Sequence, residues 1–134
     1  MAKLSIIEGI GSSYEQKLNE GGITSIEKLL EVCSTKKGRL DFAKKSGITE
    51  KLILKWANHA DLFRIKGVGG EYAELLEAAG VDTVPELATR KTENLVKKMA
   101  DVNEAKKLVR RIPTVRQIGD WIEQAGKLPR VMQY

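Results

Sequence analysis

The sequence predicts an all-α protein built from two tandem copies of one helical unit. Three observations support this: the chain matches itself at an offset of 58 residues, its apolar residues recur with helical spacing, and alternating strand patterns are nearly absent. The first copy spans residues 1–60 and the second spans residues 61–134. We expect both copies to pack into one compact body, because 134 residues with 42% hydrophobic content can bury a core.

The repeat is clearest around two glycine-rich segments. Ile7–Gly11 aligns with Ile65–Gly69, and the tyrosines, leucines and glycines that follow align at the same offset. Further along, the register shifts to an offset of 65, at which the two tryptophans of the chain align. The second copy therefore carries about seven extra residues, which we place between Met99 and Pro113.

Helix boundaries have recognisable signals. Three pairs have capping-box spacing, in which two side chains satisfy free helix-end donors: Ser12 with Glu15, Thr83 with Glu86, and Thr114 with Gln117. Stop signals are the glycines that follow apolar stripes, where a left-handed C-terminal residue is expected: Gly21 with Gly22, Gly80, and Gly126. These signals predict short loops between the helices.

The two glycine-rich segments also indicate a binding role. In each, two glycines flank one apolar residue, Ile10 or Val68, which we expect to plug the core while the backbone turns sharply. The following helix then presents unpaired N-terminal amides to solvent, where they can donate to a phosphate oxygen. A dinucleotide-binding fingerprint competes for these glycines, but it requires a preceding strand and a third glycine that the pattern here lacks.

Both segments resemble helix-hairpin-helix motifs. More closely, the run Ala60–Gly69, with Pro113, Trp121 and Leu128–Pro129, resembles a bacterial family of uncharacterised function, DUF4332, over essentially the whole chain. The resemblance implies two tandem (HhH)2-like units of the five-helix, SAM-like type. In the wider superfamily, paired hairpins straddle the minor groove of duplex DNA with little sequence preference, and a weakly bound monovalent cation sometimes bridges hairpin carbonyls and phosphate.

Under this interpretation each copy also has a second, degenerate turn. In the first copy this turn is Ser46–Thr49, which contains Gly47. Its equivalent in the second copy lies near Arg111–Thr114 and contains no glycine. The missing glycine disfavours close approach of a phosphate at that turn.

Basic charge is separated from the glycine-rich segments along the chain. A formal net charge of +5 and a pI near 9.3 favour an acidic partner, for which nucleic acid is the commonest choice. Residues 1–34 and 58–89, which hold the glycine-rich segments, carry net charges of −2 and −4, whereas residues 35–57 and 90–134 carry +5 and +6. Glu71 points a carboxylate towards where a phosphate would lie. Alternating charge also suits docking between copies or molecules, so protein binding or self-association is the alternative function.

The predicted function is non-enzymatic, sequence-independent binding of double-stranded DNA through its phosphates. The predicted turn residues are Gly9, Gly11, Ser12, Ser13, Gly47, Thr49, Gly67, Gly69 and Gly70. The predicted basic residues are Lys36, Lys37, Lys44 and Lys45, with Arg39 beside them, and Lys106, Lys107, Arg110, Arg111 and Arg116, preceded by Lys97 and Lys98. For any one basic cluster, an ordinary solvated helix face is the competing interpretation.

Other function classes are disfavoured by the residues present. One histidine and one cysteine cannot build a zinc site or a histidine-based catalytic triad, and no phosphate-loop lysine motif occurs. We therefore expect no enzymatic activity, no small-molecule substrate, and no cofactor beyond the weak cation. The single cysteine and the lack of a signal-peptide core or membrane-length apolar run predict a cytoplasmic protein without a membrane partner.

Several chemically conspicuous residues are predicted to be structural. Cys33 lies on an apolar helix face and is expected to be a buried thiol, and His59 is expected to face solvent or cap a helix. Trp56 and Trp121 are expected in the core rather than stacked on bases. The C-terminal Leu128–Tyr134 is too apolar for a solvated tail and is predicted to pack on the body, with a docking peptide as the alternative.

Overall fold

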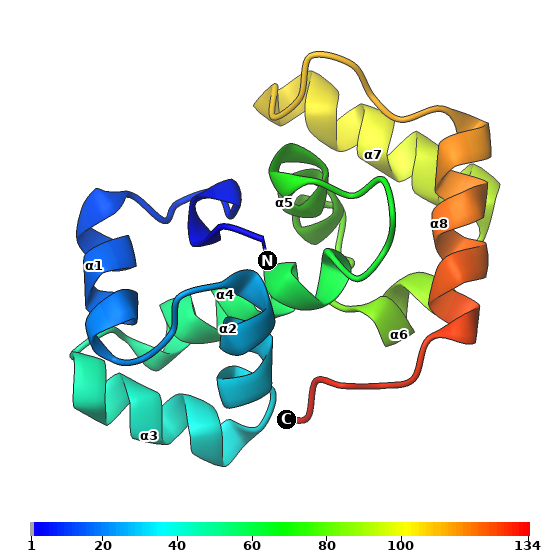
Figure 1. Ribbon diagram of the computed structural model, residues 1–134. Coiled ribbons are helices and arrows are strands. Elements are labelled where there is room, and N and C mark those ends of the chain that lie inside the picture. Colours follow the sequence, from blue (N-terminus) through cyan, green and yellow to red (C-terminus); the bar gives the residue numbers. More distant parts are fainter. Residues whose placement is uncertain (1) are drawn as a thin grey trace. The chain divides into compact units, whose positions relative to one another are not determined.

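The computed structural model describes residues 2–134, and within them it contains eight α-helices, one short 3-10 helix and no strand (Figure 1). The predicted all-α class is therefore confirmed. The chain divides into two compact units: unit 1 comprises Met1–Asp61 with Val131–Tyr134, and unit 2 comprises Leu62–Arg130. None of the helices in the described residues combines the length and apolar character needed to cross a membrane.

Unit 1 begins with the 3-10 helix and holds four α-helices. In chain order the elements are η1 (Leu4–Ile6), α1 (Ser12–Glu20), α2 (Ile26–Cys33), α3 (Lys36–Ser46) and α4 (Glu50–Leu62), whose last residue already belongs to unit 2. The hydroxyls of Ser25 and Thr35 cap α2 and α3 by accepting hydrogen bonds from amides in the first turn. Between them, Cys33 ends α2 with its side chain fully buried, as predicted.

The core of unit 1 is aliphatic, with a tryptophan from α4. Leu18, Leu29 and Ile53 are completely buried, and Trp56 is 1% exposed, which confirms its predicted core position. Tyr14 packs edge-on against this indole, with ring centroids 5.0 Å apart. This aromatic pair links α1 to α4.

The C-terminal segment packs on unit 1. Met132 is fully buried, and the backbone amide of Gln133 donates to the carbonyl of Ser34 at 2.8 Å. The guanidinium of Arg39 donates to the carbonyls of Gln133 and Cys33 at 2.8 and 3.0 Å. The predicted packing of the C-terminal segment is therefore confirmed at Met132 and Gln133. Arg39, which was expected among the basic binding residues, is instead buried and holds this segment in place.

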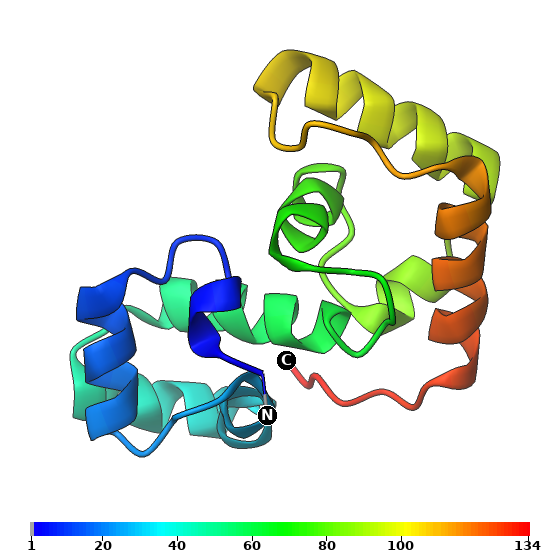
Figure 2. The same cartoon turned by 45° about the horizontal axis from the view of Figure 1, so that its top comes forward.

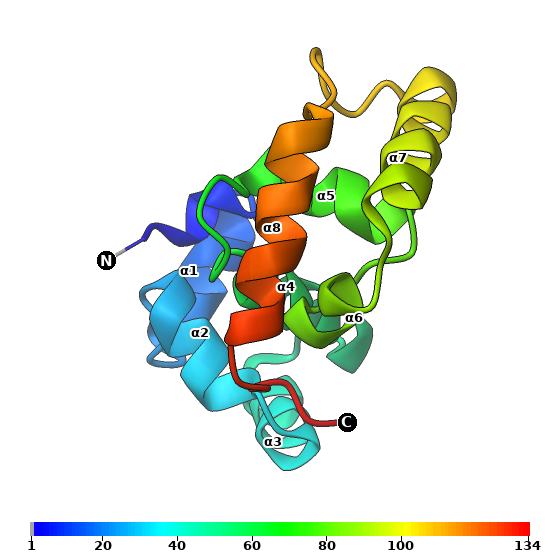
Figure 3. The same cartoon turned by 90° about the vertical axis from the view of Figure 1, so that its right-hand side faces the viewer.

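Unit 2 contains α5 (Gly70–Ala78), α6 (Val84–Ala88), α7 (Thr92–Lys106) and α8 (Val115–Lys127). The α8 helix packs against α6 and α7, and α7 also packs against α5. Figure 3 shows α8 lying along this group. The core is again mostly aliphatic, with Trp121 only 2% exposed and in contact with Tyr72, 5.3 Å between ring centroids.

The extra length of the second copy takes two forms. The α7 helix has 15 residues where α3 has 11. The connection to the next helix is also longer, spanning residues 107–114 instead of 47–49. Figure 2 shows this connection, in orange, returning alongside α7 to the start of α8. Because α7 begins two residues before the position equivalent to the start of α3, these differences amount to the net seven residues of the register shift.

Of the three predicted capping boxes, one forms completely. Thr114 accepts from the amide of Gln117, whose side chain accepts from the amide of Thr114. The Ser12 prediction is wrong, because Gly11 is the N-cap and Ser12 is already the first helical residue. Thr83 is the N-cap of α6, but its hydroxyl bonds the Glu86 side chain at 3.3 Å instead of a backbone amide.

The predicted glycine stop signals hold at two of three places. Gly22 and Gly80, which follow α1 and α5, both have φ of +93°. Gly126 instead lies inside α8, because that helix continues through Lys127 before turning extended at Leu128. The prediction that His59 faces solvent or caps a helix is also wrong, since its side chain is completely buried within α4.

Candidate nucleic-acid interface

Two glycine turns of matching geometry lead into α1 and α5. The first glycine turn is Ile7–Gly11 and the second is Ile65–Gly69. Gly9 and Gly67 have φ of +94° and +98°, in the left-handed region that favours glycine. The central apolar residues, Ile10 and Val68, are 6% and 7% exposed and plug the cores of their units, as predicted.

Both turns deliver free amides at the start of a helix. The N-caps are Gly11 and Gly69, which have no side chain to accept a hydrogen bond from the first helical turn. In the second turn, the amides of Gly70, Glu71 and Tyr72 have no acceptor among the described residues. These amides and the positive end of the helix dipole face the same place, which favours an anion there.

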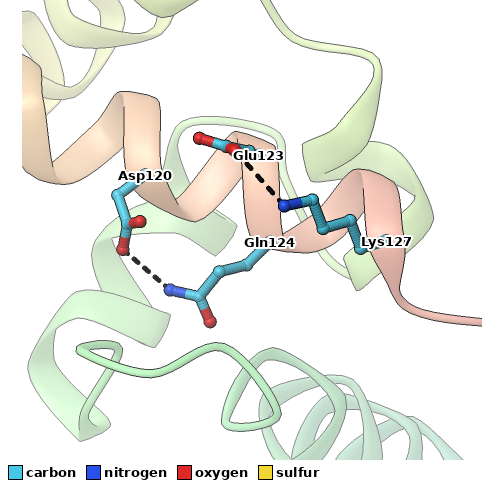
Figure 4. Close-up of polar contacts among 4 residues, drawn as sticks. All are labelled: Asp120, Glu123, Gln124 and Lys127. Carbon is cyan, nitrogen blue, oxygen red and sulfur yellow. Dashed lines mark hydrogen bonds and ion pairs between the residues drawn. The ribbon is translucent and has the colours of Figure 1, made fainter.

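The second glycine turn is held by α8. A Cβ at Gly67 would come within 2.9 Å of the Trp121 indole nitrogen, so the turn lies directly on this ring. The side-chain amide of Gln124 accepts from the amide of Lys66 at 2.9 Å and donates to its carbonyl at 3.2 Å. Figure 4 shows how Asp120 orients Gln124, accepting from its Nε2 at 2.8 Å, while Lys127 and Glu123 pair beside them. Two residues of α8 thus fix the turn.

The connection between α7 and α8 is anchored beside α5. The hydroxyl of Tyr72 donates to the carbonyl of Arg111 at 3.1 Å. The side-chain amide of Asn103 bonds both the amide and the carbonyl of Val109, at 2.9 and 3.1 Å. Lys107, the C-cap residue that follows α7, takes a left-handed conformation with φ of 54° and lets the chain reverse. The connection is therefore an ordered loop.

The anchored loop and the second glycine turn line one groove. This groove has a volume of about 490 Å³, and its lining comprises Gly67, Gly69, Gly70, Glu71, Tyr72, Arg110 and Arg111. A neighbouring hollow of about 680 Å³ shares Glu71 and Arg110 with it and adds Lys107 and Glu104. We call the first of these the phosphate groove, after the ligand that is proposed for it below. The fold thus brings Arg110 and Arg111 beside the free amides at the start of α5. In the sequence these amides lie in the acidic segment 58–89, apart from any basic cluster.

The first glycine turn has no comparable basic partner. Ser12 and Ser13 are exposed at the start of α1. Lys45 of the basic cluster donates instead to the carbonyl of Gly21, at the opposite end of α1. Nine helical residues, a rise of about 13 Å, separate the two ends. Lys45 therefore caps the carbonyl end of α1 rather than supporting its amide end.

The other predicted site residues are exposed but dispersed. Gly47 is the left-handed C-cap of α3, and Thr49 accepts from the amide of Leu52 at 3.3 Å as α4 begins. The remaining exposed basic residues lie on α3, on α7 and in the first turn of α8: Lys36, Lys37, Lys44, Lys97, Lys98, Lys106 and Arg116. Arg39, counted with the first cluster, is only 2% exposed and cannot contact a phosphate.

Metal and cation binding find little support in the arrangement. Across residues 2–134, no three His, Cys, Asp or Glu side chains come together as a metal ion would need. In the second glycine turn, the carbonyls of Ile65 and Lys66 already accept from Val68 and Gln124. A monovalent cation would have to share these oxygens, so the turn does not fit a cation site at those positions.

Sequence reasoning missed the residues that assemble the groove. Gln124 forms hydrogen bonds with the backbone of Lys66, which is distant in sequence, and Asn103 does so with Val109 in an irregular loop. No local sequence pattern predicts such contacts. The left-handed conformation of Lys107 could not be predicted either, because glycine and asparagine are the residues that usually adopt it. The weak clue was the aligned pair Tyr14 and Tyr72, since a tyrosine at that position has a hydroxyl that can reach a neighbouring loop.

Comparisons with known proteins give one positive finding. A family model described as Domain of unknown function (DUF4332) matches residues 8–128 of the chain. Among curated proteins, and likewise among solved structures, none matches the chain significantly.

Proposed function

The chain belongs to the DUF4332 family, whose description assigns no function, and from its own groove we propose that it binds double-stranded DNA without catalysis and without sequence preference. The phosphate groove carries this proposal, because it combines free α5 amides with the side chains of Arg110 and Arg111. Backbone amides at a helix start and guanidinium groups are both strong ligands for phosphate oxygens. Contacts of these groups with phosphate oxygens carry no information about base sequence.

We further propose that the two glycine turns are the hairpins of a tandem helix-hairpin-helix arrangement. Support comes from their common geometry: a positive φ at Gly9 and Gly67, a buried apolar residue, and an extended glycine N-cap. A cytoplasmic location is part of the same proposal and rests on the single cysteine of the sequence.

The two units are proposed to contribute unequally. In unit 2 the groove gathers amides and arginines, whereas in unit 1 Lys45 is committed to the far end of α1. The first glycine turn offers its amides and two serine hydroxyls alone. Most of the electrostatic binding free energy is therefore expected from unit 2.

A carboxylate in the groove limits its affinity. Glu71 lies in the first turn of α5, where its negative charge stabilises the helix start. A bound phosphate would be repelled by it, and the two arginines offset this repulsion. We therefore expect modest affinity in the range of non-specific DNA binding, with a Kd of about 10⁻⁴ to 10⁻⁶ M.

A salt titration of duplex DNA binding tests the proposal. Fluorescence anisotropy of a labelled duplex is measured at several salt concentrations for the native chain and for Arg110→Glu/Arg111→Glu. The double variant is expected to bind at least about tenfold more weakly and to lower the salt slope by about 2, since two phosphate contacts are lost.

The matched comparison reverses two adjacent, exposed charges of unit 1. Lys36→Glu/Lys37→Glu changes the net charge equally, but both lysines lie in the first turn of α3 and neither lines the groove. The loss of DNA affinity in this variant should be clearly smaller than the loss in Arg110→Glu/Arg111→Glu. Equal losses in both double variants would indicate a diffuse electrostatic effect, and a native Kd no better than about 1 mM at low salt would refute DNA binding.

Self-association is the second candidate function, and the acidic residues of the groove and of the neighbouring hollow favour it. Glu71 and Glu104 line the adjoining hollows together with Arg110 and Lys107, so this surface presents both charge signs to a second molecule. Sedimentation of the free protein distinguishes the two functions. A mass that rises with protein concentration in the absence of DNA, and falls with added salt, would favour assembly.

A further inference from the structure

The loop between α7 and α8 exposes two aliphatic side chains among three arginines. Ile112 is 37% exposed and Val115 is 56% exposed. Arg110, Arg111 and Arg116 lie within the same seven-residue stretch and are also exposed. Within residues 2–134, the guanidinium groups of these arginines make no hydrogen bond or ion pair. The stretch thus presents apolar surface flanked by uncommitted positive charge.

This stretch is ordered rather than loose. The Asn103 side chain bonds the backbone of Val109 on one side, and the capping box that begins at Thr114 fixes the start of α8 on the other. Between these anchors, Tyr72 bonds the carbonyl of Arg111. Figure 3 shows the loop at the N-terminal end of α8. A rigid support of this kind can hold an aliphatic side chain against an opposing surface without a large loss of conformational entropy.

We propose that Ile112 and Val115 form an apolar wedge that enters the minor groove of duplex DNA, partly unstacks one base step and bends the duplex. This inference rests on the proposed DNA binding and adds its mode. Aliphatic side chains inserted between base steps, with arginines on the adjacent phosphates, are a known way for proteins to kink DNA. Arg110 and Arg111 would contact phosphates from the groove, and Arg116, exposed in the first turn of α8, would contact a further phosphate.

The chemistry of the stretch favours DNA over an anionic lipid surface. Binding to a bilayer interface scales with the apolar area that is buried, and it is typically supplied by a long amphipathic helix or by several large aromatic residues. The wedge offers two aliphatic side chains and no aromatic one. Three arginines around so small an apolar tip instead match the narrow minor groove, which lies between two rows of phosphates and gives access to the apolar faces of the stacked bases.

The proposed wedge predicts which duplexes are bent most easily. Pyrimidine–purine steps such as TA unstack at low cost, whereas A-tracts are stiff. A duplex with a central TA step should therefore be bound more tightly than an A-tract duplex of equal length, by about tenfold or less, because only the deformation energy differs between them. Binding through phosphates alone would show a much smaller preference.

End-to-end energy transfer in a doubly labelled duplex of about 20 base pairs tests the wedge directly. The native chain should raise the transfer efficiency on saturation, because bending brings the two ends together. Ile112→Ser/Val115→Ser should weaken binding by roughly tenfold or less and abolish the rise in transfer at saturating protein. The matched control is Ile6→Ser, which removes an aliphatic side chain 44% exposed on η1 and should behave like the native chain.

The outcomes separate this inference from the proposed function. Salt-sensitive binding with no change in transfer, or a bend that survives the double substitution, would overturn the wedge and leave DNA binding intact. Absence of binding at low salt would overturn both. Binding to vesicles containing anionic phosphatidylserine, lost in the same double variant while the duplex stays straight, would assign the apolar tip to a lipid surface and likewise overturn the wedge.

Discussion

Single glycines decide how closely each turn approaches its tryptophan. Gly67 has φ of +98°, and a Cβ there would come within 2.9 Å of the Trp121 indole nitrogen. At Gly9 the corresponding distance to Trp56 is 3.9 Å, which is ordinary contact. Both alanine substitutions incur the left-handed penalty of about 1 kcal/mol, but only one also produces a steric clash. The sequence repeat treats these glycines as equivalent, whereas the structure does not.

Gly67→Ala should therefore destabilise the protein by about 1–3 kcal/mol more than Gly9→Ala, since overpacking against a buried ring adds to the backbone strain. Urea unfolding of the two variants, followed by tryptophan fluorescence, measures this difference. Equal loss in both would show that the Trp121 ring moves aside without cost. Gly67→Ala should also weaken DNA binding more than Gly9→Ala does, because it distorts the phosphate groove.

At the level of elements, the start of α8 supports both its own helix and the loop before it. The capping box of Thr114 and Gln117 satisfies two helix-end donors. Thr114→Ala should lower the free energy of unfolding by about 1 kcal/mol, the usual cost of losing an N-cap. Ser12→Ala serves as the control, because Ser12 has capping-box spacing in the sequence but does not cap α1. A comparable loss for both variants, measured by thermal unfolding, would contradict the observed assignment of the two caps.

The helices were predictable from the sequence to a greater extent than the connections between them. Apolar periodicity and the repeat indicated an all-α chain with two glycine turns, because both depend on residues close in sequence. Gly126 was misjudged, since a glycine signals a helix end only when no packing favours continuation. The loop from Lys107 to Thr114 could not be predicted, because its path is set by Asn103 and Tyr72 through tertiary contacts.

The same distinction holds for the candidate site. The glycine turns and the basic stretch were both predicted, but their meeting in one groove depends on the Tyr72 contact with Arg111, 39 residues apart. Burial of Arg39 was equally hidden, since one of its acceptors is the carbonyl of Gln133, 94 residues away. Charge counts along a chain therefore cannot say which cations are free to bind DNA. Arg39 is committed to the fold, whereas Arg110 and Arg111 are exposed at the groove.

At the scale of the whole molecule, the chain leaves unit 1, forms unit 2 and returns four residues to unit 1. In that returning segment Met132 is fully buried, and the guanidinium of Arg39 donates a hydrogen bond to the carbonyl of Gln133. The stability of unit 1 therefore depends on residues that follow unit 2 in the sequence. A cysteine inside unit 1 offers a way to measure this dependence.

Cys33, the single cysteine of the chain, reports the opening of unit 1. Burial raises the pKa of its thiol to about 11, although the positive charge of Arg39 acts in the opposite direction, so at neutral pH it is a protonated, inaccessible thiol. Met132→Ala leaves a cavity in unit 1 and should cost about 2–5 kcal/mol, which corresponds to labelling of Cys33 by a thiol reagent at least about 30-fold faster.

Gln133→Ala is the matched control for this measurement. Gln133 contacts Ser34 and Arg39 through its backbone amide and carbonyl, which the substitution keeps, and its side chain is exposed. Labelling of Cys33 should therefore be nearly unchanged in Gln133→Ala. If Met132→Ala also labelled at the native rate, the returning segment would contribute nothing to the closed state of unit 1. If instead labelling accelerated while the duplex DNA affinity stayed constant, the tail would be confirmed as a structural clamp of unit 1, separate from the phosphate groove of unit 2.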